Sequence, residues 1–418
     1  MPIKTIDPIA FHKLYGPKQP RVNYYARDFL DYGVMILLTV LVVGLSYGFA
    51  HPLSAIALAL CAFLLVAFPV RHGVKFRVPV LLARPQDVLF TLLYKLQNIP
   101  IILIIGLAVL LLENVLIAAT PGLPHHVEWM RTGALVLFYA HVTIISVYRT
   151  TILVEHLRKK ELVREVLMQT PWKRVIGEKT NIVLEIVHAY CTGILTHIVL
   201  IAPWYLVITH LRFSLVYLPV ALALSVLVHR KWLKTYNAWY YRDHWVGHNS
   251  EFEFLYLHGP HHDAIPSGLI AVADNGLLEG FIRYTMGAPV AFYGPVLSFL
   301  VFTTDVKADI DLHQYIPGVR PNINRRLLEV YQHSTHHYGR LEPYSMGMKT
   351  DQDSAMNWKK IFPWLPEEVL NSFKLDETLT GAEWNNPTHL ATLRLYDKYD
   401  TTKHVTNDRD ASAVPEVS

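Results

Sequence analysis

The chain alternates long apolar stretches with shorter polar segments. A helix needs about 20 apolar residues to cross the hydrocarbon core of a membrane, and six stretches reach or approach that length. The predicted membrane spans are residues 32–50, 52–70, 99–119, 132–148, 182–208 and 213–228. The pattern therefore predicts an all-α fold, a polytopic membrane helical bundle of about six spans.

Lys and Arg are distributed unevenly among the segments that flank these spans. Segments 1–27, 71–98 and 149–181 hold 18 basic residues, whereas the three intervening connections hold two. Cytoplasmic loops of membrane proteins carry an excess of Lys and Arg, so the three basic segments are expected in the cytoplasm. Six spans return the chain to the same side, where Arg230 and Lys231 follow. We therefore expect a multi-pass membrane protein with both termini on the cytoplasmic side.

Composition supports a membrane protein and argues against a nucleic-acid-binding protein and against a cysteine-based metal or redox site. Hydrophobic residues make up 52% of the chain and charged residues 17%, whereas a soluble domain carries about 25% charge. The net charge of +4 gives no reason to expect nucleic acid as a partner. Cys61 and Cys191 are the two cysteines, and both lie in apolar stretches. This placement excludes a thiolate metal site and a redox pair.

Histidine is abundant, with 22 residues, of which thirteen are scattered. Three of the scattered ones, His141, His188 and His197, lie inside predicted spans. An ionisable residue inside a membrane is a candidate functional residue, but for each of these we expect a neutral imidazole hydrogen-bonded to a neighbouring helix. The other nine are His244, His248, His258, His261, His262, His313, His333, His336 and His337.

Eight of these nine form three short motifs. Residues 244–248 read H-x-x-x-H, and residues 258–262 and 333–337 both read H-x-x-H-H. Residues i, i+3 and i+4 share one face of an α-helix, so each motif presents its imidazoles together. One metal ion cannot use the whole set, since structural zinc takes four ligands, whereas two ions sharing it would keep open positions for oxygen and substrate. Imidazole suits iron, zinc, copper and nickel alike, so the spacing by itself leaves the metal open.

These motifs resemble the histidine boxes of the fatty acid hydroxylase/sterol desaturase superfamily. The resemblance covers residues 236–344, with Asp243 before the first box and nine residues between the first box and the second. It implies a non-haem centre of two iron ions on the cytoplasmic face of a helical bundle, with the eight box histidines as ligands. His313 matches the isolated histidine that family members often place upstream of the last box, although Pro317 stands where a second one often follows.

The resemblance also implies O₂ activation and attack on an unactivated C–H bond of a fatty-acyl or sterol-like lipid. We expect hydroxylation, with desaturation or oxidative demethylation as alternatives at the same site. The chain has no G-x-G-x-x-G motif after a strand and no C-x-x-C pair, so electrons are expected from a separate reductase with a ferredoxin or cytochrome. A metal transporter or sensor is the non-enzyme alternative, although a transporter should place its ligands inside the spans.

Carboxylates near the boxes are candidates to hold the second N–H of a ligating imidazole. For each of them, a solvated surface charge is the alternative. The candidates are Asp243, Asp263 and Asp311.

The predicted organisation has four parts. Residues 1–27 form a cytoplasmic N-terminal segment, and residues 28–230 form the transmembrane bundle. Residues 231–345 form the histidine-box catalytic domain, in which the short apolar stretch near 288–302, interrupted by two prolines, is expected to be a re-entrant or interfacial hairpin. Residues 346–418 form a cytoplasmic C-terminal cap and tail, in which Pro366 followed by two glutamates predicts a helix start.

Overall fold

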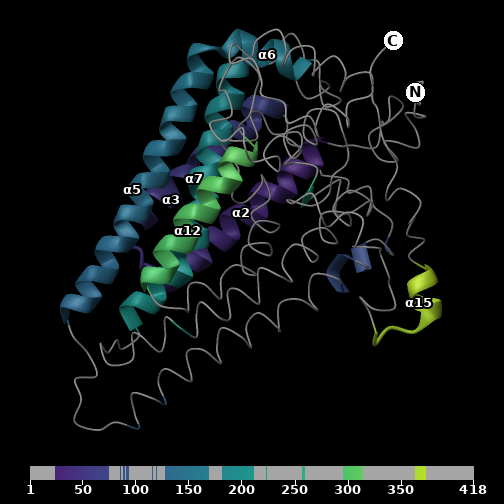
Figure 1. Cartoon of the computed structure of the whole chain (residues 1–418). Coiled ribbons are helices and arrows are strands. Elements are labelled where there is room, and N and C mark those ends of the chain that lie inside the picture. The colour runs from purple at the N-terminus through teal and green to yellow at the C-terminus, as the bar shows by residue number, and fades with distance from the viewer. Residues whose placement is uncertain are drawn as a thin grey trace, which may run out of the picture.

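The computed structural model describes residues 24–74, 128–168, 181–210, 295–313 and 363–372, together with the isolated positions 85, 88–89, 91–93, 115, 119, 223 and 257–258. Every regular element in these residues is a helix, and the longest helices form a bundle (Figure 1). The prediction of an all-helical fold is confirmed for this part of the chain.

Helices α2 (Tyr24–Ser46) and α3 (Pro52–His72) form an antiparallel hairpin. The turn between them contains Gly48 with φ +73°, a left-handed conformation that glycine adopts without a steric penalty. Pro52 occupies the first turn of α3, where its missing N–H is harmless. The turn is closed by the His51 side chain, which accepts a hydrogen bond from the backbone N–H of Leu53.

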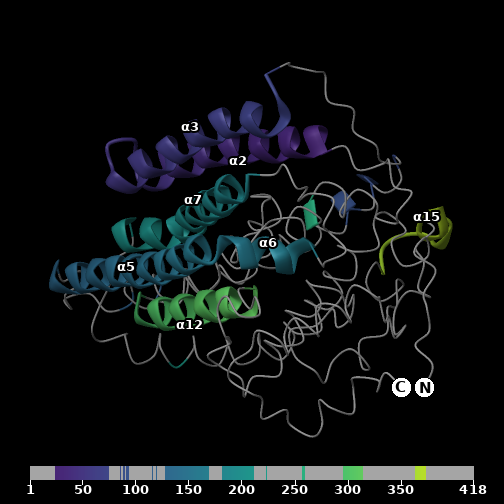
Figure 2. The ribbon, with the colours of Figure 1, turned by 90° about the horizontal axis from the view of Figure 1, so that it is seen from above.

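Helix α5 (Glu128–Arg158) continues into the short helix α6 (Lys160–Met168), and α7 (Ile182–His210) returns along α5. Helix α7 is the inner helix of the bundle, because 72% of its apolar segment is buried, against 28–33% for the corresponding segments of α2, α3 and α5. Figure 2 shows α7 between the α2–α3 hairpin and α5. This central position brings side chains of α7 into contact with every other long helix described.

Within the described residues, four helices are long and apolar enough to cross a membrane: Asp28–Ser46, Pro52–His72, Arg131–Arg158 and Ile182–Thr209. They coincide with four of the six predicted spans, which are thereby confirmed as long apolar helices. Large apolar side chains such as Leu45 and Leu65 are exposed on their outward faces, as expected of a surface in contact with lipid. The predicted spans 99–119 and 213–228 fall almost entirely outside the described residues and stay predictions.

Helix α12 (Pro295–His313) lies against α5, on the side away from α2 and α3 (Figure 2). Thr303 contacts His141 of α5, and Lys307 contacts Tyr148 further along α5. The residue numbers rise together along the two helices, so α12 runs in the same direction as α5.

The expected hairpin near 288–302 overlaps this helix. Residues 295–302 belong to one continuous helix that ends at His313. Residues 288–294, which would contain the turn, lie outside the described residues. The helix therefore extends beyond the apolar stretch to His313, and the hairpin itself stays a prediction.

The helix directions give the bundle two different ends. At one end, which we call the charged end, Asp28, Arg71 and Glu185 come together. At the opposite end, which we call the tyrosine end, Tyr47 packs against Tyr205 with ring centroids 4.9 Å apart. The starts of α2 and α7 and the end of α3 lie at the charged end. The basic segments expected in the cytoplasm adjoin these helix ends.

The described part of the C-terminal region contains the short helix α15 (Glu367–Ser372). It follows Pro366 directly, and two glutamates occupy its first turn, where carboxylates interact favourably with the helix dipole. The helix start predicted at Pro366 is confirmed.

Candidate functional site

Two of the nine predicted metal ligands, His258 and His313, lie in the described residues, and both side chains are buried. Asp311 lies in the last turn of α12. Among the residues that the structure describes, no group of three or more His, Cys, Asp or Glu side chains is arranged to hold a metal ion. The other predicted site residues lie outside that part of the chain and stay predictions: His244, His248, His261, His262, His333, His336, His337, Asp243 and Asp263.

His313 is the last residue of α12, and its side chain is held by its own helix. Nδ1 lies 2.6 Å from the backbone oxygen of Asp309. A carbonyl oxygen only accepts hydrogen bonds, so Nδ1 carries a proton, and the Asp309 carboxylate lies 3.7 Å from the same nitrogen. In the neutral tautomer with this proton, Nε2 is the atom that carries the lone pair. A backbone carbonyl holds one ring nitrogen in the same way in many metal-binding histidines. The ring therefore fits the role of a neutral nitrogen ligand through Nε2.

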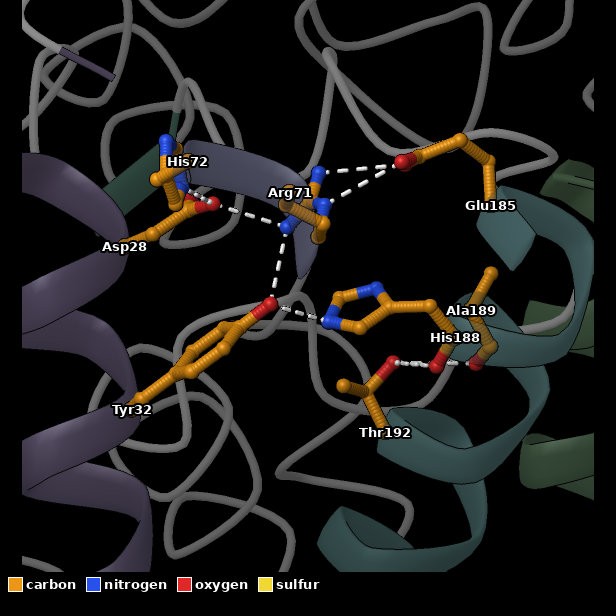
Figure 3. Close-up of polar contacts among 8 residues, drawn as sticks. All are labelled: Asp28, Tyr32, Arg71, His72, Glu185, His188, Ala189 and Thr192. Carbon is orange, nitrogen blue, oxygen red and sulfur yellow. Dashed lines mark hydrogen bonds and ion pairs between the residues drawn. The ribbon is translucent and has the colours of Figure 1, made fainter. Parts of the chain in front are cut away.

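A network of buried polar side chains lies at the charged end (Figure 3). Arg71 of α3 donates from Nε and Nη2 to the two carboxylate oxygens of Glu185 in α7, at 3.1 and 3.0 Å. Its Nη1 donates to Asp28 in α2 at 2.7 Å, and Nε2 of His72 lies 2.7 Å from the same oxygen. Two-point arginine–carboxylate contacts are strong and directional, so Arg71 links the three long apolar helices α2, α3 and α7. We call this set the Arg71 cluster: Asp28, Tyr32, Arg71, His72, Glu185 and His188.

Tyr32 connects Arg71 to a buried histidine. Arg71 Nη1 also donates to the Tyr32 hydroxyl at 2.8 Å, and that hydroxyl hydrogen-bonds to Nε2 of His188 (Figure 3). While it accepts from Arg71, the hydroxyl either donates its own proton to Nε2 of His188 or accepts from that atom, according to the tautomer of the ring. His188 is hydrogen-bonded to a neighbouring helix, as predicted. Since Arg71 already donates to three partners, the cluster has the character of a structural clamp rather than an anion-binding site.

A second polar chain lies in the interior of the bundle and links α12, α5 and α7. Thr303 Oγ1 lies 2.8 Å from Nδ1 of His141, and Nε2 of His141 lies 3.1 Å from Nε2 of His197. One Nε2 must donate and the other must accept, because two N–H groups or two lone pairs would repel each other. The prediction that each ring bonds to a neighbouring helix is confirmed. We call Thr303, His141 and His197 the imidazole chain.

Aromatic rings enclose the imidazole chain. Trp204 lies 5.6 Å from His141 between ring centroids and stacks on Phe302, also at 5.6 Å. His197 Nδ1 and Trp204 Nε1 are buried and have no hydrogen-bond partner among the residues described. Apolar surroundings favour neutral rings, because burying an unpaired charge is expensive.

At the tyrosine end, His51 caps the start of α3. Its Nδ1 lies 3.2 Å from the Leu53 backbone nitrogen, its Nε2 lies 2.8 Å from the Tyr139 hydroxyl, and its ring stacks on Tyr47. A neutral ring with the proton on Nε2 satisfies both hydrogen bonds. Partial burial lowers the pKa of His51 below its ordinary value of 6.5, since burial disfavours the charged form.

Comparison with known proteins was made at the level of families, sequences and folds. No protein-family model, curated protein or solved structure matches this chain. The interpretation of its function therefore rests on its own residues and their geometry.

The Arg71 cluster was not predicted from the sequence, apart from His188. Glu185 lies inside the apolar stretch 182–208, and Arg71 directly follows the stretch 52–70. Ionisable residues at the same predicted end of neighbouring spans are the signal that was available. Which of them pair is decided by the helix packing.

Proposed function

We propose that this protein is a membrane-bound non-haem di-iron oxidoreductase that uses O₂ to hydroxylate an unactivated C–H bond of a fatty-acyl or sterol-like lipid. The observation that carries the proposal is the set of histidine boxes at residues 244–248, 258–262 and 333–337, with His313 before the last box. Imidazole nitrogens are suitable ligands for iron. Bound iron would supply O₂ activation and C–H cleavage, and the protein would supply ligands, orientation and exclusion of water.

The two predicted ligands in the described residues support this proposal. His258 and His313 are 0% and 3% exposed, whereas histidines with no role beyond the surface would be solvated. Because Nδ1 of His313 donates to the Asp309 carbonyl, Nε2 would be the ligating atom. Because α12 runs parallel to α5, His313 lies toward the charged end, which the basic segments associate with the cytoplasm.

The bundle would hold the catalytic domain where its substrate dissolves. The outward faces of α2, α3 and α5 expose apolar side chains, including Leu45, Leu65 and Val147. A lipid substrate would therefore reach the site from the bilayer, with the metal centre and both termini on the cytoplasmic side. Electrons would come from a separate reductase with a ferredoxin or cytochrome docked on that side.

Metal analysis combined with lipid analysis tests the proposal. We expect purified protein to hold two iron ions per chain and an expressing host to accumulate a lipid that has gained one oxygen atom. His336→Ala, which removes a predicted ligand, should lose both properties. The control His404→Ala, at a histidine outside the boxes, should keep both. Unchanged oxidised lipid in His336→Ala would contradict the proposal.

The same site would also support desaturation or oxidative demethylation. Lipid analysis distinguishes these outcomes, because desaturation removes two hydrogens and demethylation removes a carbon. In either case the proposed iron centre is the same and only the product of the reaction differs.

A different observation favours a metal transporter or sensor. His141, His188 and His197 are buried inside membrane-spanning helices, where ionisable residues often mark ion pathways. They are hydrogen-bonded to each other or to Tyr32 instead of facing a common centre. Zinc without iron in the active protein, together with zinc uptake into vesicles containing it, would support this second candidate.

A further inference from the structure

Helix α12 contacts α5 at two levels. Thr303 Oγ1 lies 2.8 Å from His141 Nδ1, and four residues further along, Nζ of Lys307 lies 5.1 Å from the ring centroid of Tyr148. Two contacts separated along both helices define the direction of α12 and its depth in the bundle. The hydrogen bond at Thr303 is the more directional of the two.

The surroundings of His141 favour one position of α12 along its axis, the position in which Thr303 is hydrogen-bonded to His141. His141 also bonds to His197, and the stacked rings of Trp204 and Phe302 lie next to it. A shift of α12 by one turn moves Thr303 by about 5.4 Å. The ring nitrogen of His141 would then lose its partner in an interior that offers little water, which is unfavourable. The imidazole chain therefore favours a single depth of α12.

The depth of α12 determines the position of His313. His313 follows Thr303 by ten residues in the same helix, which corresponds to about 15 Å along the axis. The Asp309 carbonyl fixes the ring relative to the helix. A displacement of α12 would therefore move His313 Nε2 by a similar amount.

We propose that His141 and Thr303 are positioning residues for the predicted metal ligand His313. Their hydrogen bond sets the depth of α12, and α12 carries His313 Nε2 to the metal centre. This inference rests on the proposed function. It extends the metal site to two residues outside the histidine boxes and, through His197, to the inner helix α7.

A pair of neighbouring threonines provides a matched test. Thr303→Val removes the hydroxyl and keeps the shape of the side chain. Thr304→Val is the control, because the Thr304 side chain is exposed and its hydroxyl donates within its own helix, to the Leu300 carbonyl. The readouts are the iron affinity and the Mössbauer spectrum of the purified full-length protein. We expect Thr303→Val to bind iron about tenfold more weakly, the effect typical of losing an outer partner of a metal ligand, and to show a changed quadrupole splitting.

The control and the rescue variant should behave differently from Thr303→Val. Thr304→Val should match wild type in both readouts. Thr303→Ser keeps a hydroxyl in the same place and should restore the wild-type spectrum.

Two substitutions at His141 test the same point without changing α12. An asparagine amide lies close to the position of Nδ1 and keeps the bond to Thr303, whereas a glutamine amide lies closer to Nε2 and keeps the bond to His197. We expect His141→Asn to retain the wild-type spectrum and His141→Gln to resemble Thr303→Val. If Thr303→Val does not fold, this pair decides the question.

The outcomes separate the two proposals. Wild-type protein that binds no iron would overturn the proposed function and this inference with it. Wild-type protein that binds iron, with identical spectra and affinities for Thr303→Val and Thr304→Val, would overturn this inference alone. If the wild-type protein binds iron, identical spectra for His141→Asn and His141→Gln would likewise overturn this inference alone.

Discussion

Arg71 of α3 and Glu185 of α7 form a two-point ion pair between residues that lie 114 positions apart in the sequence. Their side chains are 13% and 11% exposed, and Asp28 is a second, equally buried partner of Arg71. A buried ion pair often adds little net stability, but removal of one partner leaves an uncompensated charge in the interior. Replacing Arg71 alone should therefore destabilise the protein more than replacing Arg71 together with both carboxylates.

Replacement of Arg71 tests the clamp at the charged end. Arg71→Met should lower the free energy of unfolding by about 3–5 kcal/mol, because it leaves two buried carboxylates without their cation. Denaturant titration in detergent micelles measures this value. Neutralising the carboxylates as well, in the triple variant Arg71→Met/Asp28→Asn/Glu185→Gln, should recover much of the loss.

The control for Arg71→Met is Arg164, which is partly exposed and has an exposed carboxylate partner. Arg164 lies 3.7 Å from Glu161, which is 74% exposed, and such pairs contribute about 0–1 kcal/mol. Arg164→Met should therefore change stability little. Equal losses for the two arginine variants would contradict the clamp.

His51 at the tyrosine end makes a pH-dependent contribution to stability. Its pKa is lowered by burial in the folded protein, whereas in the unfolded chain it titrates near its ordinary value of about 6.5. The unfolded state therefore takes up the proton more readily. The contribution of His51 should be constant above about pH 6.5 and should decrease as the pH falls through the lowered pKa. Protonation of Nδ1 also removes the acceptor for the Leu53 N–H.

The variant His51→Asn isolates this effect, because asparagine caps a helix without titrating. The free energy of unfolding should be compared between wild type and variant from about pH 8 to pH 5. We expect a constant difference in the upper part of this range and a relative loss for wild type in the lower part. A difference that does not change with pH would exclude His51 as the titrating group.

Trp204 gives a prediction about two substitutions at one position. It is fully buried, yet its indole N–H has no hydrogen-bond partner in the described part of the chain. Trp204→Phe removes this donor and should lower the free energy of unfolding by only about 1 kcal/mol, since no hydrogen bond is lost. Trp204→Ala also removes the stacking on Phe302 and should lower it by about 3–5 kcal/mol. Similar losses for both variants would indicate that the N–H is hydrogen-bonded in the membrane.

Metal removal provides a further check on the proposed centre. A ligand that binds only the folded state at 100 times its dissociation constant stabilises it by about 2.7 kcal/mol. Chelation of iron should therefore lower the unfolding temperature of wild type, and re-addition of iron should restore it. His336→Ala should start at the lower temperature and not respond to chelation. A response of His336→Ala equal to that of wild type would remove this residue from the ligand set.

Much of the fold followed from local sequence patterns. Hydropathy predicted the four helices that are long and apolar enough to cross a membrane, and Pro366 with the following glutamates predicted the start of α15. The hydrogen bonds that join His141, His188 and His197 to neighbouring helices followed from the high free energy of an unpaired polar group in an apolar interior. These features depend on residues close together in sequence or on the apolar surroundings of a single side chain, so one sequence suffices to predict them.

The pairings inside the bundle did not follow from those patterns. Hydropathy identifies Glu185 and Arg71 as polar residues near span ends but contains no information on which helices are neighbours. The joining of His141 to Thr303, 162 positions apart, depends on α12 packing against α5 in one direction and at one depth. The end of α12 at His313 likewise exceeds the apolar stretch expected near 288–302, because Val306 and Ile310 continue the buried face of the helix at helical spacing among polar residues.

The sequence by itself therefore determined the helical class of the described part of the chain and the apolar helices that hydropathy can detect, and its histidine boxes predict a metal centre. Only the tertiary structure decided that Arg71 joins α2, α3 and α7 and that the imidazole chain joins α5, α7 and α12. The physical reason is that hydrophobic burial is nearly non-directional and can be satisfied by many packings. Hydrogen bonds between buried polar groups are directional, and they select one packing among them.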